Sequence, residues 1–169
     1  MKYYILITVL FLATPLSAQK ITVDESKSTI SFNFIDDDVD GIFEEFEFTG
    51  NVDLSDLQNS TLSGSVITKT IDTNNWFRSR HLRSRKYFNT KDFPKIKFNS
   101  TAISGVAEGF QVTGTLQIKG IERTVIWSFT NDGEKLTGIT SVNTHDYNIS
   151  LHNSKDRNKV TVKIVLPYH

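Results

Sequence analysis

Apolar and polar residues alternate along most of the chain after Gln19. Segments 30–34, 46–54, 110–118 and 160–166 each place an apolar residue or a glycine at every second position. A period of two is that of a β-strand with one dry face and one wet face. With about eight such segments separated by turn residues, the pattern predicts an all-β fold, either an antiparallel up-and-down barrel or a sandwich.

Glycine-containing turns are expected between these strands. The strongest hairpin signal is the Asn-Asp-Gly sequence at 131–133, because Asp-Gly supplies the positive φ angles that a tight turn requires. Further reversals are expected between Gly105 and Gly109 and at the Lys-Gly pair 119–120. No repeat, low-complexity tract or linker divides the chain, which indicates one domain over residues 19–169.

The alternation stops between residues 72 and 91, where apolar residues recur at roughly helical intervals. Asp72 and Asn74 are suitable N-cap residues, and Pro94 closes the segment because proline disfavours helix in the residue before it. We expect one or two short helices inserted between strands, with their aromatic side facing inward. The residues of that side are Trp76, Phe77, Leu82, Tyr87 and Phe88.

The first eighteen residues have the features of a secretory signal. Lys2 precedes an apolar run over residues 5–13, and Ala18 is a small residue at the expected cleavage site. The run is too short to span a bilayer comfortably, and a buried N-terminal strand is the weaker alternative. We expect cleavage after Ala18 and a mature protein in the periplasm or the medium.

Composition excludes several functions. The chain has no cysteine, which rules out thiol catalysis, thiolate metal sites and disulfide exchange. Without Lys2, the 19 basic residues become 18 against 19 acidic ones, a net charge of minus one with neutral histidine. Such a balance gives no electrostatic reason to expect a nucleic acid partner.

Phenylalanine is abundant, with 12 in the chain, and most of these residues lie on the predicted inner faces. From pattern alone, a well-filled core is the simpler interpretation. The alternative is a cavity, since a barrel of about eight strands can either be filled by side chains or hold one small ligand. Gly50, Gly64 and Gly114 fall on the inner faces, where they either leave room for a ligand or mark bends in the wall.

Three groups of residues resemble motifs of the YceI-like family. The central one lies within 71–101 and contains Asp-Thr at 72–73, His-Leu-Arg-Ser at 81–84 and Phe-Pro at 93–94. The others are Gly-x-Leu-x-Ile-x-Gly at 114–120, followed by Thr124, and the glycines and phenylalanines of 41–50. The resemblance covers essentially the whole mature chain. It implies an exported, lipocalin-like antiparallel barrel that encloses a polyisoprenoid, such as an isoprenoid quinone tail, with no enzymatic activity common to the family.

The chain departs from the family pattern at several polar positions. Ser79 and Lys86 stand where the family usually has Asp, and Thr144 stands where it usually has Arg. These changes bear on contacts to the head group of a ligand more than on the fold.

From these patterns we predict an apolar binding site inside the barrel and a polar group at one of its ends. The predicted ligand-contacting residues are Phe32, Phe34, Phe46, Phe48, Trp76, Phe77, Leu82, Phe88, Phe98, Val112, Leu116, Ile118, Trp127, Phe129, Val162 and Ile164. The predicted head-group or structural polar residues are Asp72, Asn75, Arg78, His81 and Arg83.

The basic cluster at residues 78–86 has two interpretations. Guanidinium groups suit phosphate and carboxylate, so it could clamp an anionic head group at the barrel mouth. It could instead be a solvated helix face. For Asp72 and His81 we favour a structural role, in which Asp72 bonds to an arginine or to His81 and fixes the insertion.

Catalytic and metal chemistry find little support. The four histidines show no ligand-like spacing, there is no Gly-x-Ser-x-Gly elbow, and the acidic run at 36–41 lacks the ligand order of an EF-hand. We therefore expect no catalytic residue, no metal and no cofactor other than a bound isoprenoid or lipid. The expected partner is an apolar small molecule, bound by a monomer or homodimer. The alternatives are an enzyme acting on an apolar substrate in the same cavity, and a packed barrel that serves as a protein-interaction module.

Overall fold

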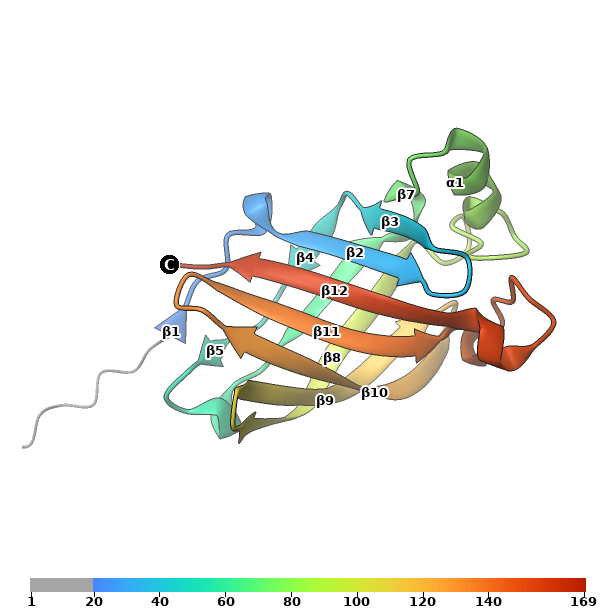
Figure 1. Cartoon of the computed structure of the whole chain (residues 1–169). Coiled ribbons are helices and arrows are strands. Elements are labelled where there is room, and N and C mark those ends of the chain that lie inside the picture. The colour runs from blue at the N-terminus through green and yellow to red at the C-terminus, as the bar shows by residue number, and fades with distance from the viewer. Residues whose placement is uncertain (1–19) are drawn as a thin grey trace, which may run out of the picture.

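An antiparallel sheet of ten strands curls into an incomplete barrel (Figure 1). The computed structural model describes residues 20–169, so the predicted signal sequence and its cleavage site lie outside the described residues. The strand order in the sheet is β4-β6-β8-β9-β10-β11-β12-β2-β3-β7. The predicted all-β barrel with a helical insertion is confirmed, with more strands than the eight expected.

The elements follow one another as a meander with short interruptions. The strands are β1 (Lys20–Ile21), β2 (Thr29–Phe34), β3 (Val39–Phe43), β4 (Phe46–Phe48), β5 (Val52–Asp53), β6 (Ser63–Ile67), β7 (Ile71–Asp72), β8 (Lys95–Val106), β9 (Gly109–Ile118), β10 (Ile121–Asn131), β11 (Lys135–Asn143) and β12 (Lys159–Pro167). The α-helix is α1 (Trp76–Arg83), and the short 3₁₀ helices are η1 (Glu25–Lys27), η2 (Leu57–Asn59), η3 (Thr68–Thr70), η4 (Thr144–Tyr147) and η5 (Lys155–Asn158). In the described part of the chain, no helix combines the length and the apolar character needed to cross a membrane.

The long strands β8 to β12 pair in sequence order through the predicted turns. Lys119 and Gly120 both have positive φ, at 51° and 74°, which is the geometry of a two-residue hairpin that matches the twist of its strands. Between β10 and β11, Gly133 has a φ of 93°, and the Asp132 carboxylate accepts the backbone N–H groups of Glu134 and Lys135. All three predicted reversals are therefore confirmed.

Strand β12 closes the meander onto the N-terminal half by pairing with β2. Phe32 lies opposite Val162 and Ile30 opposite Ile164, so the inner faces of the two strands are in register. The apolar residues of both strands join one core that extends around the curled sheet.

The pairing is interrupted at one place, which we call the seam: β3 pairs with β7 and β4 pairs with β6, and the ladder is broken between these two pairs at residues 44–45 and 68–70. Glu45 lies in this break: its carbonyl accepts the N–H of Ile67 at 3.1 Å, and its own N–H bonds to Thr70 Oγ1 at 3.3 Å. Segment 46–54, predicted as one strand, is broken after Phe48. The ring of Phe48 lies over Gly50, and glycine weakens the interior of a strand. The next strand, β5, leaves the main sheet and pairs with β1.

Helix α1 stands outside the barrel wall beside β3 and β7 (Figure 1). Its N-cap is Asn75, whose side chain accepts the N–H of Arg78 at 3.0 Å, rather than the predicted Asp72 or Asn74. Ser79 and Leu82 form its buried face. Trp76 and Phe77 are 60% and 78% exposed, so the prediction that they face inward is wrong. The helix turns its buried face toward the polar partners of Ser79, which leaves this aromatic pair on the outside.

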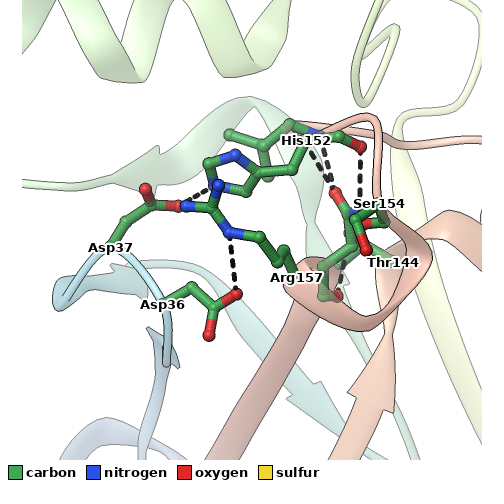
Figure 2. Close-up of polar contacts among 8 residues, drawn as sticks. Asp36, Asp37, Thr144, His152, Ser154 and Arg157 are labelled. Carbon is green, nitrogen blue, oxygen red and sulfur yellow. Dashed lines mark hydrogen bonds and ion pairs between the residues drawn. The ribbon is translucent and has the colours of Figure 1, made fainter.

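The loop between β11 and β12 is held to the β2–β3 turn by two polar contacts (Figure 2). His152 Nε2 lies 2.8 Å from Asp37 Oδ2, and Arg157 Nε donates to Asp36 Oδ2 at 3.3 Å. Inside the loop, the fully buried Asn158 accepts two backbone N–H groups and donates to two backbone carbonyls. One amide side chain thus satisfies four backbone groups of this loop.

We predict that Asn158→Ala lowers the free energy of unfolding by about 2–4 kcal/mol, because it leaves several backbone groups of the loop without partners. Urea denaturation followed by circular dichroism measures the change. Asn153→Ala, at an exposed position of the same loop, is the control and should change stability by less than about 0.5 kcal/mol. Equal effects of the two substitutions would contradict the role assigned to Asn158.

Candidate ligand-binding cavity

An apolar cavity lies inside the curled sheet. The volume within which the centre of a water molecule can move is about 120 Å³, and all the space between the lining atoms, including solvent at the open side, is about 960 Å³. An engineered apolar cavity of roughly 150 Å³ in another protein stays dry and takes up benzene. The interior is therefore large enough for a small apolar group. A longer molecule has to follow the gaps between the side chains, which suits a slender chain better than a fused ring system.

Twelve of the sixteen predicted ligand-contacting residues line this cavity. They are Phe32, Phe34, Phe46, Phe48, Phe88, Phe98, Leu116, Ile118, Trp127, Phe129, Val162 and Ile164. Their contact with a ligand stays a prediction, but their convergence on one space follows from the alternation, which points every second side chain of a strand inward.

Four predicted residues lie elsewhere. Val112 and Leu82 are almost completely buried in the core without lining the cavity. Trp76 and Phe77 are on the exposed surface of α1. A residue on the inner face of a strand can therefore be covered by its neighbours instead of lining the cavity. The pattern of apolar positions does not distinguish these two cases.

The remaining lining residues are not among the predicted ligand contacts, although Gly64 falls on a predicted inner face. They are Ile30, Phe43, Leu62, Ser63, Gly64, Ser65, Val66, Ile96, Lys97, Val142, Thr144 and Val160. Ile30 and Val160 could have been predicted, because each lies on the inner face of an alternating segment in which two other inner residues are predicted to contact the ligand. The members on the short strand β6 have a weak signal, because glycine and serine interrupt its apolar run.

The inner-face glycines do not leave empty space in the way the sequence suggested. A side chain at Gly50 would meet the ring of Phe48, and one at Gly114 would meet the ring of Phe98 and the carbonyl of Asn99. At Gly64 the nearest neighbours are the Glu47 carbonyl, at 2.8 Å from the position of a Cβ, and the ring of Phe46, at 3.3 Å. Each of these glycines accommodates a close neighbour.

Two further glycines show the same arrangement in its simplest form. Phe32 lies directly opposite Gly41, and Phe129 directly opposite Gly138. In both pairs the ring lies where the glycine Cβ would be, at 2.5 Å for Gly138. The ring therefore lies against the barrel wall instead of projecting into the interior, so glycine keeps the cavity open indirectly.

Three partly accessible aromatic residues line the cavity beside the seam. Phe43, Phe46 and Phe48 line the cavity next to the seam and are only half-buried. Val162, on the inner face of β12, is also half-buried although its strand neighbours Val160 and Ile164 are buried. The accessible surface of Val162 faces the interior, so space remains in front of this side chain.

Few of the residues that line the cavity are polar. Thr144, at the loop end, uses its hydroxyl to bond the Asn158 carbonyl at 3.4 Å. Lys97, Ser63 and Ser65 belong to the side formed by β6 and β8, and the side chain of Ser65 bonds outward to Glu47. Beneath the loop, burial raises the pKa of Tyr147 to about 12, so its hydroxyl stays neutral. The lining thus offers neither a paired acid and base nor an activated nucleophile.

The predicted polar group lies in and around α1, and none of its members lines the cavity. Asp72 accepts the Ser79 hydroxyl at 2.9 Å, Arg83 donates to the Ile71 carbonyl at 2.6 Å, and Asn75 caps the helix. His81 contacts the Tyr87 hydroxyl at 3.2 Å, and Arg78 is exposed. Asp72 therefore fixes the insertion, as expected, but through Ser79 rather than through an arginine or His81.

The chain resembles known proteins over nearly all of its described length. A model of the YceI-like domain matches residues 21–167. A UPF0312 protein of Photorhabdus laumondii is 34% identical over 86 residues, which is 51% of this chain and 45% of that protein, so the match spans less than half of the relative.

Solved structures share the fold. BcnA of Burkholderia cenocepacia superposes with a TM-score of 0.74 at 22% identity, covering 86% of this chain and 98% of BcnA. A polyisoprenoid binding domain from Saccharophagus degradans gives a TM-score of 0.58 at 14% identity, covering 90% and 99%. These likenesses establish the fold, and the match over residues 21–167 shows that the chain belongs to the family of YceI-like domains.

Proposed function

We propose that this chain is an exported binding protein that holds a long apolar molecule inside the barrel, as a carrier or a store. The ligand class is a polyisoprenoid, an isoprenoid quinone or a related lipid. The observation that carries the proposal is the cavity inside the barrel, which is partly open and lined almost entirely by apolar side chains. An apolar surface exposed in this way gains free energy when a hydrocarbon chain covers it, at roughly 25 cal/mol per Å².

Two further observations support this proposal. The structurally similar domain from Saccharophagus degradans is a polyisoprenoid binding domain. The apolar run and small-residue site at the N-terminus support export. A packed barrel acting as a protein-interaction module would have a filled interior, which the cavity argues against. An enzyme would need a reactive pair within the cavity, and no such pair lies among the lining residues.

We predict that organic extraction of protein purified without detergent releases an isoprenoid lipid. Mass spectrometry of the extract identifies it, and an extract of a same-sized exported protein from the same cells is the control. Repeated absence of lipid, together with no uptake of added farnesol, would contradict the proposed function.

We predict that Val162→Trp raises the Kd for farnesol by at least about tenfold, because the indole occupies the open part of the cavity. Val165→Trp is the matched control on the outer face of the same strand and should leave the Kd unchanged. Farnesol titration by calorimetry gives both values. Unchanged affinity in Val162→Trp would mean that the ligand site lies elsewhere.

We predict that Gly138→Ala weakens farnesol binding several-fold, because the new methyl group displaces the Phe129 ring into the interior. Both nearest neighbours at Gly138 are side chains, so the backbone can stay in place. Gly105→Ala is the control, since its Cβ would meet only Leu57 at 3.8 Å. A crystal structure of Gly138→Ala with the ring unmoved and the affinity intact would refute the role given to these glycines.

A further inference from the structure

The outer surface of α1 combines exposed aromatic and basic side chains. Trp76 and Phe77 are among the most exposed large apolar residues of the described chain, and their rings contact each other edge to face at 4.8 Å. Arg80 lies over the ring of Trp76 at 5.3 Å. We call this area the basic aromatic surface, and its residues are Trp76, Phe77, Arg78, Arg80, Arg85 and Lys86.

The helix that carries this surface is firmly attached to the barrel. The buried hydroxyl of Ser79 accepts the N–H of Thr73 and donates to Asp72, both at 2.9 Å. Leu82 is buried, and Arg83 bonds the Ile71 carbonyl. At 100° per residue, Phe77 lies on the face opposite Ser79 and Leu82. Its exposure is therefore fixed by the attachment of the helix, and a local rotation would not bury it.

The charge of this region is one-sided. Residues 73–91 contain six Lys and Arg residues and no Asp or Glu, although the whole chain has formal net charge zero. None of the ion pairs found among residues 20–169 includes Arg78, Arg80, Arg85 or Lys86. These four cations therefore have no carboxylate partner within the described chain and remain available to an external anion.

The basic aromatic surface is not a clamp for the head group of a molecule inside the barrel. Its members point to solvent, and none lines the cavity. A broad array of cations flanking two exposed aromatic rings matches an extended anionic surface with an apolar layer beneath it. Aromatic side chains favour the interface of a bilayer, and each Lys or Arg near anionic lipid strengthens attachment.

We propose that the basic aromatic surface docks the protein onto an anionic lipid bilayer, with Trp76 and Phe77 inserted at head-group level and the cations on the lipid phosphates. The purpose of docking rests on the proposed function, because a carrier of a membrane lipid must reach the membrane. Docking itself requires no ligand in the cavity.

The position of the surface relative to the cavity agrees with loading from a bilayer. Lys86 is two residues from Phe88, which lines the cavity. The Phe88 ring contacts the ring of Phe43 at 6.3 Å, and Phe43 stands half-buried at the seam. A bilayer against α1 would therefore lie close to the part of the cavity that Phe43 and Phe88 line.

Vesicle co-sedimentation of the purified protein tests the docking. One set of vesicles contains phosphatidylcholine alone and the other equal parts of phosphatidylcholine and phosphatidylglycerol, both without isoprenoid. We expect binding to the anionic set and its loss on addition of salt, which screens the charges. Trp76→Ser/Phe77→Ser and Arg80→Gln/Arg85→Gln should each weaken binding on the order of tenfold.

Matched controls replace exposed residues elsewhere on the barrel. Ile126→Ser/Ile139→Ser changes two exposed apolar residues of β10 and β11, and Lys159→Gln/Lys163→Gln removes two exposed charges from β12. Both should bind anionic vesicles like the wild type. If the wild type does not sediment, or if test and control variants lose binding equally, the proposal is overturned and a protein partner becomes the better explanation of the surface.

A second readout separates this proposal from the proposed function. Trp76→Ser/Phe77→Ser should keep the wild-type Kd for dissolved farnesol but extract an isoprenoid from anionic vesicles on the order of tenfold more slowly. If the wild type does not bind farnesol, the proposed lipid-binding function is wrong, and vesicle docking can still be measured. Unchanged extraction by the variant would defeat the docking role and leave the binding function intact.

Discussion

The interior of this barrel depends on the packing of phenylalanine rings onto glycines across the sheet. A phenylalanine on the inner face of a small barrel would normally point toward the axis and meet the rings from the other side. Opposite Gly41 and Gly138, the rings of Phe32 and Phe129 lie on the wall instead. Glycine costs strand stability, and the aromatic ring that covers it restores contact with the sheet. The same pairing makes the wall aromatic and leaves space along the axis.

The incomplete closure of the sheet complements this packing. A barrel with a continuous ladder would remove every free edge but would also seal its interior. Here the ladder between segments 39–48 and 63–72 is interrupted between the β3–β7 pair and the β4–β6 pair, and Glu45 places two hydrogen bonds in the break. Phe43, Phe46 and Phe48 lie on either side of the break and stay half-buried. The interruption of this ladder therefore coincides with the partly accessible aromatic part of the cavity lining.

The sequence predicted what depends on local periodicity and turn chemistry. Alternation identified the strands and the inner faces, and the Asp-Gly and Lys-Gly pairs located their hairpins. The break after Phe48 was missed, because a glycine that continues an alternating pattern looks the same whether the strand extends or bends. The orientation of α1 was missed as well: its aromatic residues suggested a buried face, whereas the hydrogen bonds of Ser79 with Thr73 and Asp72 determine which side packs. Among inner-face residues, Val112 is covered and Phe98 lines the cavity, and the packing of neighbouring strands that separates them is not encoded in the period of two.

The aromatic residues thus divide into two populations with different physical roles. Those at strand spacing, such as Phe32 and Phe98, face a dry interior and create a surface that a hydrocarbon can cover. Those of α1 are exposed to water. Burying these two large aromatic side chains would lower the free energy by several kcal/mol. The cations of the basic aromatic surface surround these rings. In a neutral hydrocarbon phase the cations would lose their hydration, so such a phase alone would not suit this surface. An anionic bilayer interface satisfies both the rings and the charges, and it is also the place where a molecule suited to the interior is dissolved.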